Sequence, residues 1–336
     1  MQITSASRNN SFDLLRLVAA LLVLWSHQFS LLGMAEPQII NGTLGVYIFF
    51  GISGYLNAQS ILNNPSWWRF LIRRTQRIYP ALFVFALFCV AVALLVTTAD
   101  MATIWEKIPT FVFKNTAILF GLEQKLPGVF LSNPVSGINV TLWTLPNEIK
   151  LYIYLALVAL AARYSPRNLL VIFSLLLVGL LIWFVVSTKN MDTVSFLKFA
   201  VIFLTGTLFA AIERQSGIVT AFVVLIAICV ASAFSASVVS FFPAIALASI
   251  LFGKLRSPSW LRPRIDISYG IYLYAYPVQQ IVASYRLPFW ESLLLSLAGS
   301  VFLGIASALL VERPALAWGR RNFKEMAGPS QMSPVR

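Results

Sequence analysis

Long apolar runs recur along nearly the whole chain, and they limit its fold more than any other feature of the sequence. Ten of them are about 17 to 23 residues long, enough for a helix to cross ~30 Å of hydrocarbon. They cover residues 11–32, 43–62, 78–97, 141–163, 168–187, 195–213, 217–234, 236–252, 267–285 and 291–311. Because lipid cannot satisfy backbone polar groups, these runs predict an all-α, polytopic membrane protein of about ten helices. A composition of 59% hydrophobic and 11% charged residues fits that class.

A formal net charge of +13 raises the question of a nucleic-acid partner, and the positions of the charges answer it. Most Lys and Arg residues lie in alternate loops, on the side of the N-terminus, as the positive-inside rule predicts for cytoplasmic loops. We therefore expect the lipid bilayer and no nucleic acid as a partner, and both termini in the cytoplasm. Residues 1–10 are a short polar lead, 11–312 a single membrane domain, and 313–336 a basic tail expected to be partly disordered.

Other classes are disfavoured. The first run is not a cleaved signal peptide, because it is long, carries a charge near each end and lacks a small-residue cleavage site after it. Cys89 and Cys229 fall within predicted spans, which favours packing over a disulfide. With one histidine and two such thiols, the sequence predicts no metal site.

The first run, SFDLLRLVAALLVLWSHQ, holds Asp13, Arg16 and His27, which is the only histidine of the chain. Arg16 and His27 are eleven residues apart, so on a helix they share one face about 16 Å from each other. Asp13, three residues before Arg16, lies on that face too. Ionisable side chains within a membrane span are costly, so all three are candidate catalytic residues.

Glu148 is the one of the twelve acidic residues that lies well within an apolar run. It follows Pro146 in the first turn of a predicted helix, where the helix dipole favours an acid without any functional role. Alternating topology, however, places Glu148 and His27 at a similar depth, roughly 8 to 10 Å below the outer interface. An imidazole and a carboxylate at one depth can form a general base and its orienting partner.

Four arginines lie in the segment PSWWRFLIRRTQRIYP, which we expect to form an interfacial helix before the third span. Arg69, Arg73 and Arg77 recur at four-residue spacing, and Arg74 lies three residues before Arg77. One interpretation is a cytoplasmic belt of arginines with the neighbouring tryptophans at the lipid headgroups. The other is a phosphate-binding site, because guanidinium groups bind phosphate through paired hydrogen bonds. Composition alone favours the belt.

Two further segments have more than one interpretation. Gly51 and Gly54 in the second run either let another helix approach closely or make room for a ligand arm, with Ser53 donating a hydrogen bond to that arm. Residues 98–140 are too interrupted to span, so we expect a re-entrant or surface segment on the outer face.

Six segments carry a resemblance to a known family. They are Arg16 and His27 with ten residues between them, GVYIFFGISGYL, RRTQRIYP, LWTLPNEIKLY, ISYGIYLYAYPV and the ERP at 312–314. In this order they resemble the membrane acyltransferase-3 family, which O-acylates sugars of bacterial envelope polysaccharides and related glycans. The resemblance covers most of the chain, in a ten-span form without an appended soluble domain.

The resemblance implies a bacterial cytoplasmic-membrane enzyme that takes acetyl groups from cytoplasmic acetyl-CoA. His27 would be the catalytic histidine, Arg16, Arg74 and Arg77 would be needed for activity, and Glu148 would be the acid of the fourth motif. Ala275 stands where many relatives carry a second histidine. We infer that His27 suffices without it.

A mechanism follows as a hypothesis. The nucleotide end of acetyl-CoA docks on the cytoplasmic arginines, its thioester arm passes Arg16, and neutral His27 takes the proton of a hydroxyl on a glycan or lipid-linked saccharide. An acyl-histidine intermediate is the less favoured variant, because a base is enough for attack by a hydroxyl.

A proton-coupled transporter or flippase is the alternative function. In it, His27, Glu148 and Lys150 would form a proton relay, since intramembrane charges mark relays as readily as catalytic sites. One deeply placed acid and the lack of an internal repeat in the sequence speak against it.

Overall fold

The structure is a computed structural model that describes residues 10–186, 191–217, 241–261, 263 and 265–326. Within these residues the regular secondary structure is entirely helical, with no strand. The all-α prediction is therefore confirmed. Most of the predicted span 217–234, including Cys229, lies outside the described residues. Cys89 is a free, buried cysteine.

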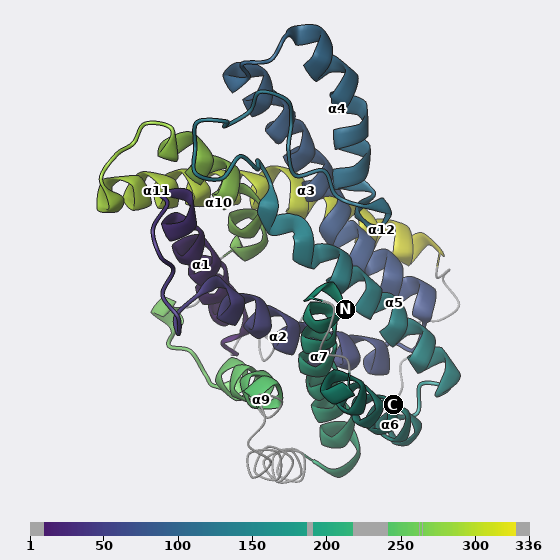
Figure 1. Ribbon diagram of the computed structural model, residues 1–336. Coiled ribbons are helices and arrows are strands. Elements are labelled where there is room, and N and C mark those ends of the chain that lie inside the picture. The colour runs from purple at the N-terminus through teal and green to yellow at the C-terminus, as the bar shows by residue number, and fades with distance from the viewer. Residues whose placement is uncertain (1–9, 187–190, 218–240, 262, 264, 327–336) are drawn as a thin grey trace.

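Eleven α-helices are described (Figure 1), and several of them match predicted spans closely. They are α1 (Phe12–Leu31), α2 (Gly42–Asn63), α3 (Trp67–Val96), α4 (Met101–Thr116), α5 (Leu145–Ala161), α6 (Pro166–Val186), α7 (Met191–Ser216), α9 (Phe241–Lys254), α10 (Ser268–Ala283), α11 (Phe289–Ser307) and α12 (Arg313–Met326). A five-residue π-helical segment, η6 (Ala308–Glu312), joins α11 to α12.

Five helical segments of the described chain are long and apolar enough to cross a membrane. They are Phe12–Leu31, Trp67–Val96, Val140–Ala161, Ser195–Ser216 and Phe289–Arg321. The helices at 166–180 and 241–254 are apolar but shorter than this criterion requires. The protein is thus a multi-pass membrane protein, while the number of about ten spans stays a prediction.

Helix α3 differs from the sequence-based prediction. The segment before residue 78 was expected to be a separate interfacial helix, but the structure has one helix of 30 residues that runs through Pro80. A proline removes one backbone donor, yet membrane helices tolerate this because neighbouring groups satisfy the freed carbonyl. The consequence is that the arginines of α3 are rigidly connected to an apolar, membrane-length helix.

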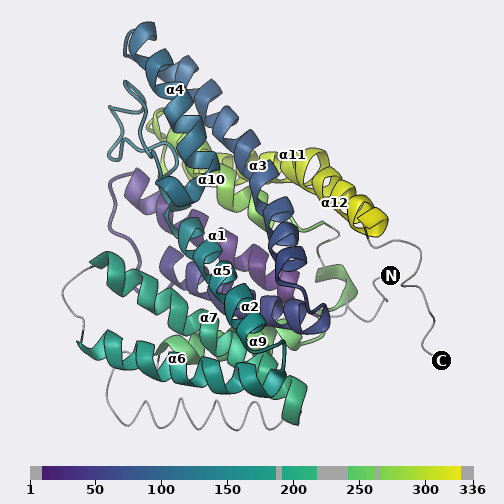
Figure 2. The same cartoon turned by 90° about the vertical axis from the view of Figure 1, so that its right-hand side faces the viewer.

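The segment after α3 folds back as α4, which packs against α3. In Figures 1 and 2, the end of α3 and the whole of α4 project beyond the other helices. The expected surface segment is therefore a helical hairpin with α3, followed by a loop and the 3-10 turn η3 (Val140–Thr144) that leads into α5.

Helix α2 lies at the centre of the bundle, packed against α1, α7 and α9. Small residues bring the backbones of α2 and α7 together: a Cβ added to Gly54 would lie 2.0 Å from the carbonyl oxygen of Phe203. A Cβ on Gly206 would lie 2.5 Å from the carbonyl oxygen of Gly51. This close approach supports the helix-packing interpretation of the glycines in the second run.

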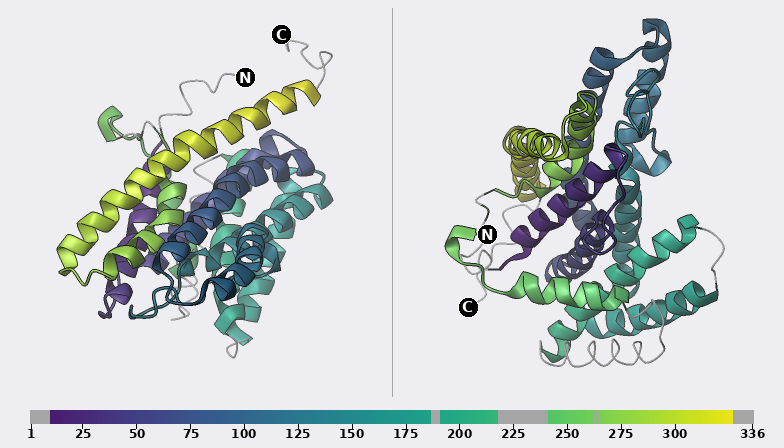
Figure 3. Two further views of the ribbon diagram at one scale, coloured as in Figure 1. Left: turned by 90° about the horizontal axis from the view of Figure 1, so that it is seen from above. Right: turned by 60° about the vertical axis from the view of Figure 1, so that its left-hand side comes forward.

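Helices α11 and α12 form one long rod that crosses the bundle, most clearly in the left view of Figure 3. Helix α10 packs along α11, and α12 reaches α3. The first part of the predicted tail is thus the helix α12, and residues 327–336 lie outside the described residues.

Replacing Gly54 with Ala should destabilise the α2–α7 contact, because the new methyl group would meet backbone rather than a movable side chain. We expect a loss of about 1–3 kcal/mol in the free energy of unfolding. Gly179 in α6 is the matched control, since nothing lies within 4 Å of its added Cβ. Thermal unfolding in detergent should show a lower midpoint for G54A and an unchanged or higher one for G179A; equal midpoints would contradict the packing argument.

Candidate functional site

Two adjacent cavities lie within the helical bundle. We call the first the arginine cavity, and its volume is about 100 Å³. It is lined by Arg16, Val46, Phe49, Phe50, Ser53, Asn57, Arg74, Arg77, Ile78, Thr144, Leu145, Glu148, Tyr152, Ser268, Tyr269 and Tyr272. The second, of about 270 Å³, is lined by Val23, Ser26, His27, Glu36, Gly42, Thr43, Val46, Tyr47, Trp143, Ser195, Lys198 and Phe199, and we call it the histidine cavity. Val46 lines both, so the cavities are neighbours.

Helix α1 contributes to both cavities. Arg16 lines the arginine cavity and His27 lines the histidine cavity, as expected for two residues on one face of a continuous helix. Eleven residues of α-helix place their Cα atoms about 16 Å apart. The spacing of Arg16 and His27 along α1 therefore places these two side chains in different cavities.

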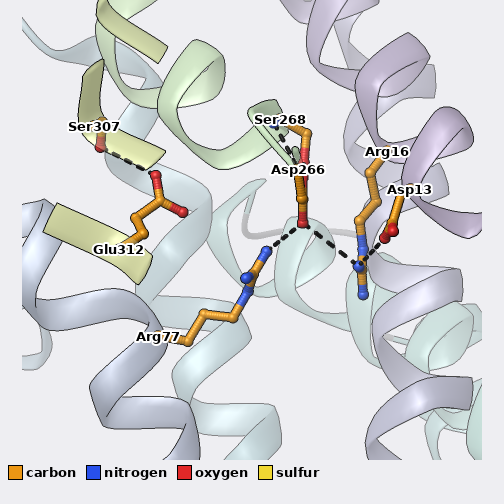
Figure 4. A network of polar contacts seen from close by, with 7 residues as sticks. All are labelled: Asp13, Arg16, Arg77, Asp266, Ser268, Ser307 and Glu312. Atoms are coloured by element: carbon orange, nitrogen blue, oxygen red, sulfur yellow. Dashed lines mark hydrogen bonds and ion pairs between the residues drawn. The ribbon is translucent and has the colours of Figure 1, made fainter. Parts of the chain in front are cut away.

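An ion-pair network centred on Asp266 joins two arginines that line the arginine cavity (Figure 4). Arg77 of α3 donates from Nη2 to Asp266 Oδ2 at 2.6 Å, and Nη1 of Arg16 lies 3.9 Å from the same oxygen. Arg16 also donates to Asp13 at 3.2 Å. Figure 4 shows Arg77 and Arg16 reaching Asp266 from opposite sides, so one carboxylate connects α1 to α3.

Asp266 is held in place by the start of α10. The backbone N–H and the hydroxyl of Ser268 donate to Asp266 Oδ1 at 3.1 Å and 2.6 Å. Burial alone would raise the pKa of Asp266, but the positive charges of Arg77 and Arg16 and the Ser268 hydrogen bonds outweigh it. The pKa of Asp266 is therefore below its ordinary value. Farther from the cavity, Glu312 accepts a hydrogen bond from Ser307 at 3.1 Å.

Glu148 lies in the arginine cavity and does not pair with His27. Ser53 donates to Glu148 Oε1 at 3.1 Å, and the hydroxyl of Tyr152 donates to the same oxygen. Asn57 in turn donates to the Ser53 hydroxyl at 3.0 Å. The similar depth expected for Glu148 and His27 thus corresponds to two neighbouring cavities rather than to one hydrogen-bonded pair.

Arg74 is enclosed by aromatic rings. Its guanidinium carbon lies 5.4 Å from the ring centre of Phe70 and 6.0 Å from that of Tyr152, and its Nη2 lies 3.4 Å from the Ser60 hydroxyl. Within the described chain, Arg74 Nε and Arg73 Nη2 are buried nitrogens without a hydrogen-bond partner. Unpaired buried donors are costly, and Arg74, which lines the arginine cavity, therefore fits a site for an anionic group.

The two interpretations of the arginine segment apply to different residues. Arg69 stacks over the ring of Trp68 at 5.1 Å, and Trp68 is exposed, as expected for a headgroup belt. Arg74 and Arg77 instead line the cavity. Arg73 does not line it, and Gly51 and Gly54 face α9 and α7. Of the three residues singled out in the second run, Gly51, Ser53 and Gly54, Ser53 is the one that lines the cavity.

The ring of His27 contacts α10. Tyr276 meets it edge to face, with ring centres 5.1 Å apart. Ala275 is buried against α1 in a cluster with Ala20, Leu24 and Ile271. The small side chain at 275 thus serves helix packing, and the next residue contacts the imidazole.

Sequence reasoning missed three charged residues of the site: Asp266, Glu36 and Lys198. Asp266 lies in a basic loop and Glu36 in a loop after α1, and both were treated as connections between spans. Each is the single acid of its loop, which was the available signal.

Lys150, by contrast, is exposed on α5. Among the described residues, no group of His, Cys, Asp and Glu side chains could hold a metal ion.

Comparisons with known proteins match nearly the whole chain. A family model described as an acyltransferase domain, that of acyltransferase family 3, matches residues 9–313. The O-acetyl transferase of Shigella phage Sf6 is 30% identical over 328 residues, which cover 91% of this chain and 96% of that protein. Nodulation protein 10 of Rhizobium leguminosarum bv. viciae is 29% identical over 371 residues, with 93% and 94% covered. No solved structure is significantly similar.

The fold and the two cavities define a multi-pass membrane protein with ionisable residues gathered inside its helical bundle. The family match extends over nearly the whole of it. The chain belongs to the acyltransferase-3 family and is therefore an enzyme that transfers acyl groups.

Replacing Asp266 with Asn should destabilise the fold, because Arg16 and Arg77 lose their shared counter-charge. We expect a loss of about 1–3 kcal/mol at neutral pH. Since the pKa of Asp266 is lowered on folding, this contribution is present above the unfolded-state pKa of ~3.9 and disappears as the pH falls through the lower folded-state value.

Thermal unfolding of D266N and wild type in detergent, at neutral pH and at a pH below ~3, measures this difference. Asp13→Asn is the control, because its side chain is 54% exposed and a surface ion pair contributes ~1 kcal/mol or less. An equal loss in both variants, or a difference for D266N that persists undiminished in acid, would contradict the assignment.

Proposed function

We propose that this protein is an integral-membrane O-acetyltransferase that moves an acetyl group from cytoplasmic acetyl-CoA to a hydroxyl of an envelope or exported glycan. It would lie in the bacterial cytoplasmic membrane with about ten spans and both termini in the cytoplasm. The observation that carries this proposal is that α1 brings Arg16 into one cavity and His27 into the cavity next to it. A donor and an acceptor can therefore approach one point from opposite sides.

The arginine cavity fits the donor. Arg74 and Arg77 line it, and the unpaired Nε of Arg74 supplies a charged donor for a phosphate oxygen. The ~16 Å between Arg16 and His27 is comparable with the length of an extended pantetheine arm. The thioester carbonyl would then lie near Val46, the residue shared by both cavities.

The histidine cavity fits a sugar acceptor. Trp143, Tyr47 and Phe199 provide aromatic surfaces for the apolar face of a sugar ring, while polar side chains of the cavity can bond its hydroxyls. Neutral His27 accepts the proton of one hydroxyl as its oxygen attacks the thioester carbon. The carbon–sulfur bond breaks, the thiolate of CoA leaves, and the protonated imidazole gives up its proton to restore the enzyme.

A histidine that acts as a base needs no acyl-enzyme intermediate, so direct transfer is the simpler course. The transporter alternative requires a relay through His27, Glu148 and Lys150. Purified protein supplied with acetyl-CoA and an oligosaccharide separates the two: consumption of the thioester with acetylation of the sugar supports the enzyme, and solute movement without thioester consumption supports the transporter.

Replacing His27 with Ala should abolish acetyl transfer while the protein still inserts in the membrane. Loss of a general base typically lowers the rate by about 10²–10⁴-fold. Labelled acetyl-CoA and mass spectrometry of the glycan, with and without the variant, measure the effect. Acetylation at the wild-type rate by H27A would refute the role of His27.

Replacing Arg74 with Ala should weaken binding of the donor, because a buried guanidinium no longer meets its phosphate. We expect KM for acetyl-CoA to rise about 10- to 100-fold, which corresponds to ~1.5–3 kcal/mol for a charged hydrogen bond. Arg69→Ala is the matched control, since Arg69 stacks on the exposed Trp68. A similar KM for both variants would argue that the arginines serve only the headgroup region.

A further inference from the structure

The histidine cavity contains its own carboxylate. Among the described residues that line it, the side chains charged at neutral pH are those of Glu36 and Lys198, whereas Glu148 lines the other cavity. Glu36 lies in the connection between α1 and α2, which brings it back over the last turns of α1. A carboxylate and an imidazole that line one cavity can interact electrostatically, although the side chain of Glu36 is also exposed to solvent.

Glu36 is fixed at both ends of this connection. The hydroxyl of Ser26, the residue directly before His27, donates to Glu36 Oε1, and the backbone N–H of Gly42 donates to the same oxygen at 3.4 Å. Gly42 is the first residue of α2, where the helix dipole favours a negative charge. Both hydrogen bonds that the structure gives Glu36 fall on Oε1, so Oε2 keeps its lone pairs for the cavity.

We propose that Glu36 is the positioning carboxylate of His27: its negative charge stabilises the imidazolium that forms when His27 takes the proton of the acceptor hydroxyl. This inference rests on the proposed function and replaces Glu148 in the role of orienting acid. Ser26, which donates to Glu36, directly precedes His27 in α1, so this hydrogen bond holds Glu36 beside the helical turn that carries His27.

The proton balance assigns no transfer to Glu36. The hydroxyl proton moves to the imidazole, the new ester bond forms as the carbon–sulfur bond breaks, and the imidazolium later returns the proton to the thiolate or to water. Glu36 keeps its charge throughout and lowers the energy of the charged state of His27. Removing that charge should therefore slow the chemical step more than it weakens donor binding.

The other charged or phenolic side chains that line this cavity or contact His27 also affect the charge of its imidazole. Lys198 of α7 carries a positive charge that opposes the imidazolium, while Tyr47 of α2 and Tyr276 of α10 are neutral phenols. Loss of Glu36 and loss of Lys198 should thus move the pH dependence of acetyl transfer in opposite directions. A purely structural role would not produce this pair of shifts.

The test compares Glu36→Gln, Glu36→Ala, Lys198→Gln and Glu148→Gln, using purified full-length protein, acetyl-CoA and an oligosaccharide that the wild type acetylates. E36Q keeps an oxygen that can accept from Ser26 and Gly42 and removes only the charge. We expect kcat to fall about 10- to 100-fold in E36Q, with KM for acetyl-CoA within about threefold of wild type. The acidic limb of the profile of kcat/KM against pH should move by about one unit to lower pH in E36Q and to higher pH in K198Q.

Each outcome decides. A wild-type profile for E36Q with a loss of activity only in E36A would show that Glu36 merely holds the loop, and would overturn the proposal. A shift of the acidic limb in E148Q but not in E36Q would return the role to Glu148. If the wild type itself transfers no acetyl group, or H27A transfers it normally, the proposed function fails instead, independently of Glu36.

Discussion

Ionisable side chains inside an apolar bundle must be paired, because the free energy of an isolated charge there is prohibitive. Asp266 meets this requirement for two arginines at once, from a position just before α10. Its carboxylate connects α1 and α3, the two helices that carry the arginines of the arginine cavity. Asp266, anchored by Ser268, offsets part of the positive charge of the arginines, and Glu148 adds a second carboxylate within the cavity itself.

Much of the fold follows from the length of the apolar runs. The first, second, fourth, fifth and sixth runs match α1, α2, α5, α6 and α7 closely, because a helix is the one open structure that satisfies its own backbone in lipid. The start of α3 could not be predicted in this way. The proline at position 80 is a helix breaker in water, and its toleration depends on neighbours that the sequence does not display.

The site was predictable only where its residues are close in sequence. Arg16 and His27 share one helix, so their spacing alone places them on one face. The partnership of Ser53 with Glu148, and that of Arg77 with Asp266, join residues 95 and 189 positions apart, and no local pattern encodes them. Depth in the membrane is also a coarse coordinate: it put Glu148 level with His27, but the side chains of α2 between them create two compartments instead of one.

The contact between α2 and α7 has a mechanical consequence. Their backbones touch at Gly54 and Gly206, so α2 cannot slide or roll along α7 without a collision of main-chain atoms. Helix α2 also supplies Val46 to both cavities and Ser53 to the arginine cavity. Because α2 is held against α7 in this way, it cannot move so as to open one cavity while it closes the other. The geometry favours a stationary partition between the two cavities. Under the proposed function, selection among acceptors would then depend on the shape of a preformed cavity rather than on a closing movement.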